Sequence, residues 1–182
     1  AATLVMPSLD DETTHFGDAS LEEPLARYAA LGVAEQVVKD GAEGATLVFG
    51  GERSHAPSAR VEKIVDTTSA GDSFNGAFLA RIAVGATPQE AARFAADVAA
   101  AVAGLGAGQP LHDETRAVHA AGFYRPGEGI VAAFEDVGRH NALDKLVGGL
   151  ARGGIDPAGG AVVMTSRVSV DLVQKVAVAG VP

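Results

Sequence analysis

The chain has 182 residues, of which 47% are hydrophobic and 20% charged, and its formal net charge is -9. This composition supports a packed core, while the negative charge, with no basic cluster to offset it, argues against a nucleic-acid or anionic-membrane surface. No apolar run reaches the roughly 20 residues of a membrane span, and no signal-peptide pattern occurs, so a cytoplasmic protein is expected. The chain has no cysteine, which excludes disulfides, thiolate metal sites and cysteine nucleophiles within it.

The first half of the chain alternates short strands and helices. A plausible capping box at residues 20–23 opens a helix that Gly32 ends, and Asp40–Gly44 is a hairpin signal between two strands. In chain order we predict strand 3–6, a helix start at 10–12, helix 20–30, strands 36–39 and 45–49, a strand that ends at 64–65, and helix 73–84. Residues 87–90, with a proline near the first turn, open a further helix that runs from 91 to about 102. Alternating elements of these lengths indicate an α/β architecture.

The segment Asp66-Thr-Thr-Ser-Ala-Gly-Asp-Ser-Phe-Asn-Gly-Ala77 predicts an anion-binding turn followed directly by a helix. Its small residues let the backbone approach a ligand, and the unpaired N–H groups of a helix start favour negative charge. Asp72 stands at the junction, where a carboxylate could deprotonate a hydroxyl. The alternative is an ordinary strand–turn–helix capped by Ser69 or Asp72.

This segment resembles the second signature of the pfkB/ribokinase family of carbohydrate kinases, above all the 2-keto-3-deoxygluconate kinases. The resemblance implies that Asp72 is the catalytic base and that the backbone at Thr68, Ala70 and Gly71, with the N–H of Asp72, holds the phosphates of ATP. It implies ATP and Mg²⁺ as cofactors and a sugar acid as substrate.

Two earlier segments extend the resemblance. Residues 37–45 are similar to the nucleotide-side strand and turn of the kinases, which places Lys39, Gly41 and Gly44 near ATP; taken alone they predict only a hairpin. Asp11 stands where relatives carry a residue of the magnesium–phosphate network, although an acidic helix start is also good capping. One departure is Ala96, which stands where relatives often carry an asparagine near the adenine.

The kinase resemblance covers residues 1 to about 108, which correspond to the C-terminal portion of that fold. Both ends of the chain look cut from something longer. Without a sugar-binding half to orient a substrate, we expect very weak kinase activity, because orientation supplies much of the rate of phosphoryl transfer.

Beyond the glycine-rich stretch 104–110 the sequence changes character. We predict strands 118–124 and 130–134, a helix that ends near 152, strand 161–164 and helix 170–178. Arg139 and Arg167 can each fork onto phosphate oxygens. His140 and Asp144 are four residues apart, hence on one helical face, and could hold each other's orientation; the alternative is a solvated face with an incidental pair.

This half resembles the FdhD formate dehydrogenase accessory sulfurtransferases, in Thr115–His119, in the run Glu-Asp-Val-Gly-Arg-His-Asn-Ala-Leu-Asp-Lys at 135–145, and in Thr165-Ser-Arg followed by Leu172-Val-Gln-Lys. That family passes sulfur to the molybdenum cofactor and binds its guanine dinucleotide form in a fold that resembles cytidine deaminases. The resemblance implies a site for molybdopterin guanine dinucleotide or a guanine nucleotide at Arg139, His140, Asn141, Asp144, Ser166 and Arg167. Formate dehydrogenase or a cysteine desulfurase would be the partner. The family's Cys-x-x-Cys pair lies upstream of the match, so this part is expected to bind cofactor without carrying persulfide.

We therefore expect an α/β chain: a partial ribokinase-like unit over 1–108 and a partial FdhD-like, cytidine-deaminase-like unit over 109–182. Their open edges and apolar faces would either pack together or make the chain self-associate. Three functions are open: a truncated carbohydrate kinase, which is the favoured hypothesis; an FdhD-like accessory protein that binds molybdenum cofactor; and a non-catalytic fusion or truncation product. Titration with ATP–Mg against GDP discriminates the first two, and binding of neither, with a non-cooperative melt, favours the third.

Overall fold

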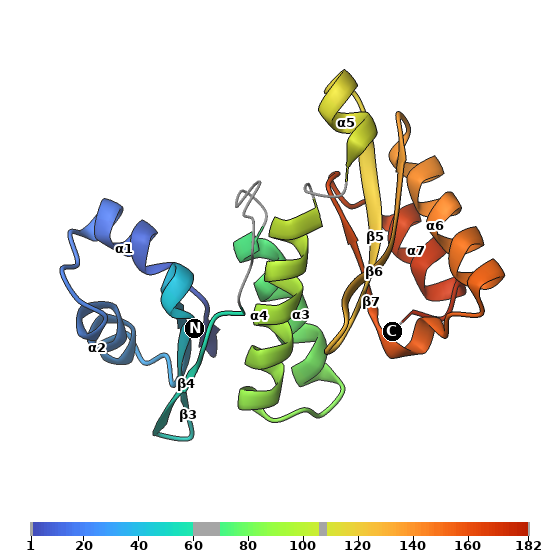
Figure 1. The fold of residues 1–182 in the computed structure, drawn as a ribbon. Coiled ribbons are helices and arrows are strands. Elements are labelled where there is room, and N and C mark those ends of the chain that lie inside the picture. The colour runs from blue at the N-terminus through green and yellow to red at the C-terminus, as the bar shows by residue number, and fades with distance from the viewer. Residues whose placement is uncertain (1, 60–69, 106–108, 182) are drawn as a thin grey trace. The chain divides into compact units, whose positions relative to one another are not determined.

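A computed structural model describes residues 2–59, 70–105 and 109–181, which fall into two compact units (Figure 1). The first unit holds the described residues up to 59 and those from Gly71 to Asp97. The second is built mainly from Val98 onward. Both contain a sheet and helices, so the prediction of an α/β chain is confirmed.

The first unit contains a four-stranded sheet with the order β1-β2-β3-β4. β1 (Leu4–Val5) is parallel to β2 (Glu35–Lys39), while β3 (Ala45–Phe49) is antiparallel to both β2 and β4 (Glu52–Ala56). β4 is a strand that was not predicted. Its first four residues are polar or charged and exposed, which suits an edge strand but removes the apolar signal by which strands are found.

The predicted hairpin at 40–44 is present between β2 and β3. A short 3₁₀ turn, η1 (Gly41–Glu43), makes the connection, and the Asp40 N–H donates to the Gly44 carbonyl at 2.7 Å. Gly44 has φ 100°, a conformation that favours glycine. The adjoining Val37, Val38 and Leu47 are almost completely buried, so the hairpin belongs to the core of this unit.

Two helices of the first unit are joined by an ionic network. They are α1 (Leu9–Phe16) and α2 (Glu22–Ala30). The Arg27 guanidinium donates to both oxygens of Asp18, at 2.6 and 2.5 Å, and also to Glu12, which accepts the Tyr28 hydroxyl at 2.9 Å. Both carboxylates are buried, so their pairing with one cation offsets the cost of removing them from water.

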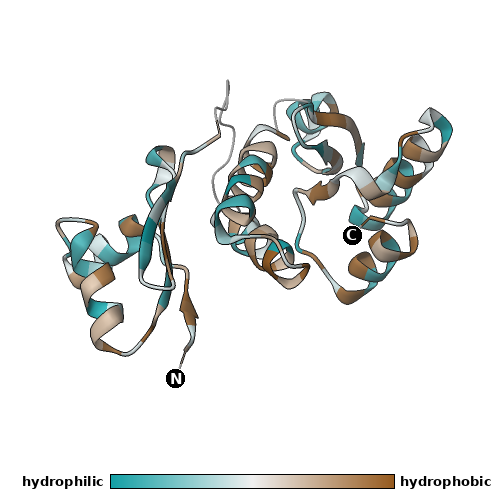
Figure 2. Cartoon of the chain, turned by 90° about the horizontal axis from the view of Figure 1, so that it is seen from below, coloured by the Kyte–Doolittle hydropathy of each residue, from teal (hydrophilic) through white to brown (hydrophobic). Residues whose placement is uncertain are grey.

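Helices α3 (Ala70–Ala83) and α4 (Pro88–Leu105) follow. Phe74 and Phe78 of α3 are buried and stack with ring centroids 6.3 Å apart. The Glu90 carboxylate accepts the Thr87 N–H at 2.9 Å and the Thr87 hydroxyl at 2.7 Å, which caps the start of α4 where the sequence predicts it. Figure 2, coloured by hydropathy, shows hydrophobic and hydrophilic residues on the helices of both units.

The second unit is a three-stranded sheet covered by helices. β5 (His119–Arg125) lies between β6 (Gly129–Asp136) and β7 (Ala161–Met164) and is antiparallel to each. Since both outer strands oppose β5, they run in the same direction. Their carboxyl ends therefore lie at one edge of the sheet, where Asp136 pairs with His119 and Met164 with Ala121.

A helix follows each outer strand: α6 (Arg139–Gly153) after β6 and α7 (Val170–Val178) after β7. Figure 1 shows both on one side of the sheet. They share one core with β5, composed of Ala121, Phe123, Ala142, Leu143, Leu146, Leu150, Leu172 and Val181. Two residues separate β6 from α6 and five separate β7 from α7, so each helix follows the carboxyl end of its strand after a short connection.

A short helix, α5 (Pro110–Thr115), precedes β5 and was not predicted. The Glu135 carboxylate, at the end of β6, accepts the N–H groups of Leu111 and His112 at 2.9 and 2.8 Å. These bonds satisfy the helix start from a residue more than twenty positions away, so no local pattern announces it.

Candidate functional site

In the first unit, Lys39 is the centre of the side chains predicted to handle phosphate. Its ammonium donates to the Asn75 side-chain oxygen at 2.9 Å. Burial lowers the pKa of Lys39, against the opposing effects of Asp72 and Asp11. Asp72 and Asp11 therefore act on Lys39 electrostatically, while its direct partner is Asn75, a residue of the motif for which no role was predicted.

The remaining predicted residues of this unit are backbone positions. Gly41 and Gly44 flank the hairpin turn next to Lys39, and Ala70 and Gly71 form the start of α3. A Cβ atom on Gly71 would lie 3.7 Å from the Lys39 ammonium, so this helix start and the lysine are close neighbours. Thr68 lies outside the described residues.

In the second unit, Asp136 organises the junction between β6 and α6. Its Oδ1 accepts the Gly138 N–H at 2.9 Å and the Asn141 amide at 3.1 Å, and its Oδ2 pairs with the Lys145 ammonium at 2.5 Å. Lys145 also donates to the Glu135 carbonyl at 3.0 Å. The Lys145 ammonium, with the Gly138 N–H and the Asn141 amide, lowers the pKa of Asp136 to about 2.

Sequence reasoning missed Asp136 and Lys145 as site residues, although both lie in the run that carries the family resemblance. The available signal was the spacing of the run. A carboxylate two residues before the helix-capping Gly138, and a lysine in the second turn, can close a ring of contacts around the start of the helix.

The six predicted residues of this unit divide by what they contact. The Asn141 amide is engaged by Asp136, and both oxygens of Asp144 accept from Lys175 of α7 at 2.8 Å. Asp144 therefore pairs with Lys175, in place of the expected pairing with His140, and links α6 to α7.

The other four predicted residues lie at the two β–α junctions of the same sheet edge. Arg139 and His140 form the first turn of α6, while Ser166 and Arg167 lie between β7 and α7. Arg139 and Arg167 are exposed, and neither guanidinium group has a hydrogen bond or ion pair within the described part of the chain. The Ser166 hydroxyl donates only to the Arg167 carbonyl, at 3.3 Å.

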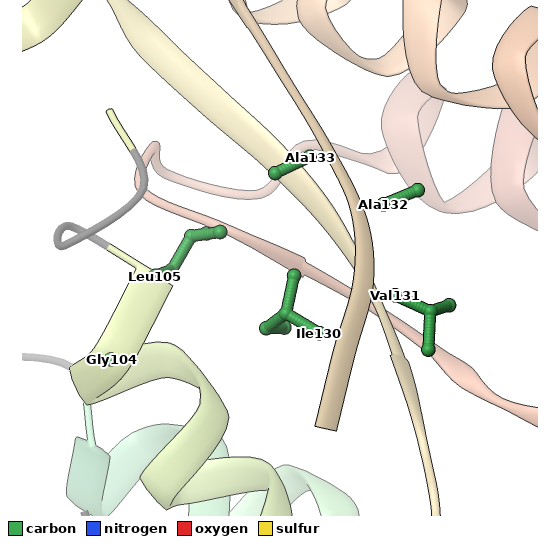
Figure 3. Close-up of a pocket in the computed structure, with 6 residues that line it drawn as sticks. All are labelled: Gly104, Leu105, Ile130, Val131, Ala132 and Ala133. Atoms are coloured by element: carbon green, nitrogen blue, oxygen red, sulfur yellow. The ribbon is translucent and has the colours of Figure 1, made fainter. Parts of the chain in front are cut away.

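An apolar hollow of about 310 Å³ lies elsewhere in the second unit, between the end of α4 and the edge strand β6 (Figure 3). It is lined by Gly104, Leu105, Ile130, Val131, Ala132 and Ala133. None of these has a polar side chain, so the hollow offers apolar contact and backbone groups and no acid–base chemistry.

We expect the Asp136→Asn variant to lower the thermal midpoint at pH 6 and to match the parent chain near pH 2. The folded pKa lies below the unfolded value of about 3.9, so the ionised Asp136 stabilises the fold above that value, and the contribution is lost as the pH falls through about 2. Thermal melts from pH 6 to pH 2 measure the gap. A gap that persists unchanged at pH 2 would contradict the assignment; Glu128→Gln, in the exposed pair with Arg125, should give a smaller effect throughout.

The described residues contain neither a candidate metal site nor a candidate membrane-spanning helix. No group of three or more His, Asp or Glu side chains within 2–59, 70–105 and 109–181 is placed to hold a metal ion. No helix within those ranges is both long and apolar enough to cross a membrane.

Two helices that each follow the carboxyl end of a strand in one sheet, with an exposed arginine near each helix start, place the chain among α/β proteins. The chain belongs to the FdhD/NarQ family, whose model matches residues 33–182. This confirms the FdhD resemblance and extends it well before residue 109. The division into units at residue 108 stays a prediction.

Curated relatives carry the name sulfur carrier protein FdhD. The protein of Brucella abortus biovar 1 (strain 9-941) is 60% identical over 86 residues, which cover 47% of this chain and 32% of that protein. The protein of Xanthomonas campestris pv. campestris (strain B100) is 41% identical over 133 residues, which cover 72% of this chain and 47% of that protein. The chain thus spans a third to a half of the length of these relatives.

Several solved structures that resemble the chain are carbohydrate or nucleoside kinases, which confirms the ribokinase-like resemblance. Ribokinase from Thermotoga maritima matches with a TM-score of 0.50 and 34% identity, over 56% of this chain and 36% of that structure. Aminoimidazole riboside kinase from Salmonella enterica matches with a TM-score of 0.51 and 27% identity, over 56% of this chain and 36% of that structure.

The expectation that the chain functions as a carbohydrate kinase is wrong. The family match over 33–182 and the FdhD relatives support the accessory protein that the sequence analysis held as its alternative. The likeness to kinases is a partial structural one, and a shared fold does not carry a shared activity.

Proposed function

We propose that this chain is an FdhD-like accessory protein of formate dehydrogenase that binds the guanine nucleotide part of the molybdenum cofactor. The site is the sheet edge where α6 and α7 begin. The observation that carries the proposal is the convergence of two β–α junctions at this edge, each with an exposed arginine that has no partner among the described residues.

The electrostatics of this edge suit a diphosphate. Unpaired N–H groups and the positive end of the dipole at each helix start favour anions, and an arginine beside each can bind phosphate oxygens in a bidentate manner. The lysines of the same helices are already neutralised, Lys145 by Asp136 and Lys175 by Asp144. The free positive charge at the junctions therefore comes from Arg139 and Arg167.

Sulfur carriage is a separate matter. The 182 residues contain no cysteine, and serine forms no stable persulfide, so these residues supply no sulfur-carrying thiol. The proposal for this chain is therefore cofactor binding. Cofactor binding is consistent with the family membership and does not require a cysteine thiol in these residues.

We expect Arg139→Ala to weaken binding of GDP about tenfold, and the double variant with Arg167→Ala to weaken it further. Loss of one charge-assisted contact to phosphate removes about 1.5–3 kcal/mol, which corresponds to at least a tenfold change. Isothermal titration of the 182-residue chain with GDP and Mg²⁺ measures the dissociation constants.

The matched control is Arg152→Ala. Arg152 is exposed in the last turn of the same helix, roughly 20 Å from Arg139 at 1.5 Å per residue. It carries the same charge, so loss of net charge alone would affect both variants equally. Equal losses for the two variants, or no GDP binding by the parent chain, would overturn the proposed site.

A further inference from the structure

The carboxylate of Asp136 lies beside the proposed anion site, and both of its oxygens have partners within the chain. It is one-fifth exposed, and its three partners all belong to the first two turns of α6 or the residue that caps them. A negative charge in this place would repel a phosphate, so its role cannot be to contact the ligand.

The contacts of Asp136 hold the start of α6 from outside the helix. Gly138 is the capping residue and has no side chain, so the usual bond from a capping oxygen to the helix is absent. The Asp136 carboxylate instead accepts hydrogen bonds from the Gly138 N–H and from the side-chain amide of Asn141 in the first turn.

The side chains of Asn141 and Asp136 pack closely beside the backbone of Gly138. A Cβ atom on Gly138 would lie 3.2 Å from the Asn141 side-chain nitrogen and 3.6 Å from the Asp136 carboxylate. Lys145 closes the ring from the second turn by bonding both the Asp136 carboxylate and the Glu135 carbonyl. These contacts fix the last residues of β6 against the start of α6.

We infer that Asp136 is a positioning residue that holds the first turn of α6, so that the Arg139 guanidinium and the helix N–H groups face the phosphates. The inference rests on the proposed function of that edge. Asn141, predicted as a ligand contact, then acts within this ring, and Lys145 completes it.

A positioning role and a purely electrostatic role of Asp136 predict opposite changes in anion affinity when Asp136 is replaced. If Asp136 acted only through its charge, its removal would strengthen anion binding, because a nearby repulsion is lost. If it holds the helix start, its removal weakens anion binding although the net charge becomes more favourable. The sign of the change therefore separates the two.

The test is titration of the 182-residue chain with GDP and Mg²⁺. Asp136→Ala should weaken binding about tenfold, the equivalent of one lost bond to a charged group. Asp136→Asn, which keeps an acceptor for the Gly138 N–H, should weaken it less, by about threefold. Glu128→Gln removes a carboxylate at the opposite sheet edge, in the turn between β5 and β6, and should leave the affinity within about twofold.

A second measurement guards against loss of the fold in Asp136→Ala. In the free, folded Asp136→Asn chain, amide hydrogen exchange at Gly138 should be faster than in the parent, while exchange at the buried Leu143 is unchanged. If folded Asp136→Asn binds GDP as tightly as the parent or more tightly, the inference is overturned. If the parent binds no GDP, the proposed function itself fails instead.

Discussion

Replacement of Gly44 by alanine is expected to destabilise the first unit by about 4 kcal/mol. Gly44 has a φ of 100°, which residues with a side chain rarely adopt. A Cβ atom there would also lie 2.2 Å from the Ala56 carbonyl oxygen and 2.7 Å from the Ser58 backbone nitrogen. Both obstacles are backbone atoms, so relief requires the hairpin between β2 and β3 to move away from the residues that end β4. Urea unfolding followed by circular dichroism, with hydrogen exchange at Leu47, measures the loss.

Gly41→Ala is the matched control in the same turn. Gly41 also has a positive φ, of 48°, but no atom lies within 4 Å of the position of its Cβ. It should therefore cost only the backbone strain, about 1 kcal/mol. The difference between the two variants isolates the steric term. Equal costs would show that the close approach of Gly44 to Ala56 does not exist in solution.

Replacement of Gly160 by alanine is expected to destabilise the second unit by about 3 kcal/mol. A Cβ atom there would lie 2.3 Å from the Tyr124 carbonyl oxygen and 2.5 Å from the Phe123 ring. Phe123 is completely buried in the core shared with α6 and α7, so the ring has little room to retreat. Because that core orients both helix starts, GDP affinity should fall together with the unfolding free energy.

The neighbouring Gly159→Ala is the control for this variant. No atom lies within 4 Å of a Cβ at Gly159, and its φ is not in the left-handed region. The change should lie within about 0.5 kcal/mol of the parent. If Gly160→Ala is equally mild, then β7 does not begin against Tyr124 and Phe123 as the structure places it.

The sequence predicted most of the regular elements because their signals are local. Apolar runs located β2, β3, β5, β6 and β7, and the glycines of residues 40–44 located the hairpin between β2 and β3. β4 was missed because four of its five residues are exposed and polar or charged, and α5 because its stabilising carboxylate comes from Glu135 in β6. β4 lies at the edge of its sheet and so needs no apolar pattern, and α5 is stabilised by a residue distant in sequence.

The functional prediction went wrong for a different reason. Kinase activity was predicted for the chain from a long motif around Asp72, although the resemblance covered only part of a kinase fold. In the structure the Lys39 ammonium contacts Asn75, and Asp72 and Asp11 are near enough to raise the pKa of Lys39 against the effect of burial. Motifs identify ancestry, while function has to be argued over the whole site and the whole family match.

The sequence by itself determined the two resemblances, the α/β class and the absence of a sulfur-carrying cysteine, because each depends only on which residues occur and in what order. Only the tertiary structure decided which side chains are free to bind a ligand. It pairs Asp144 with Lys175 and encloses Asn141 within the contacts of Asp136, and it leaves Arg139 and Arg167 exposed at one sheet edge. The physical reason is that strands β6 and β7 run in the same direction on either side of β5, which brings two helix starts together from segments about thirty residues apart.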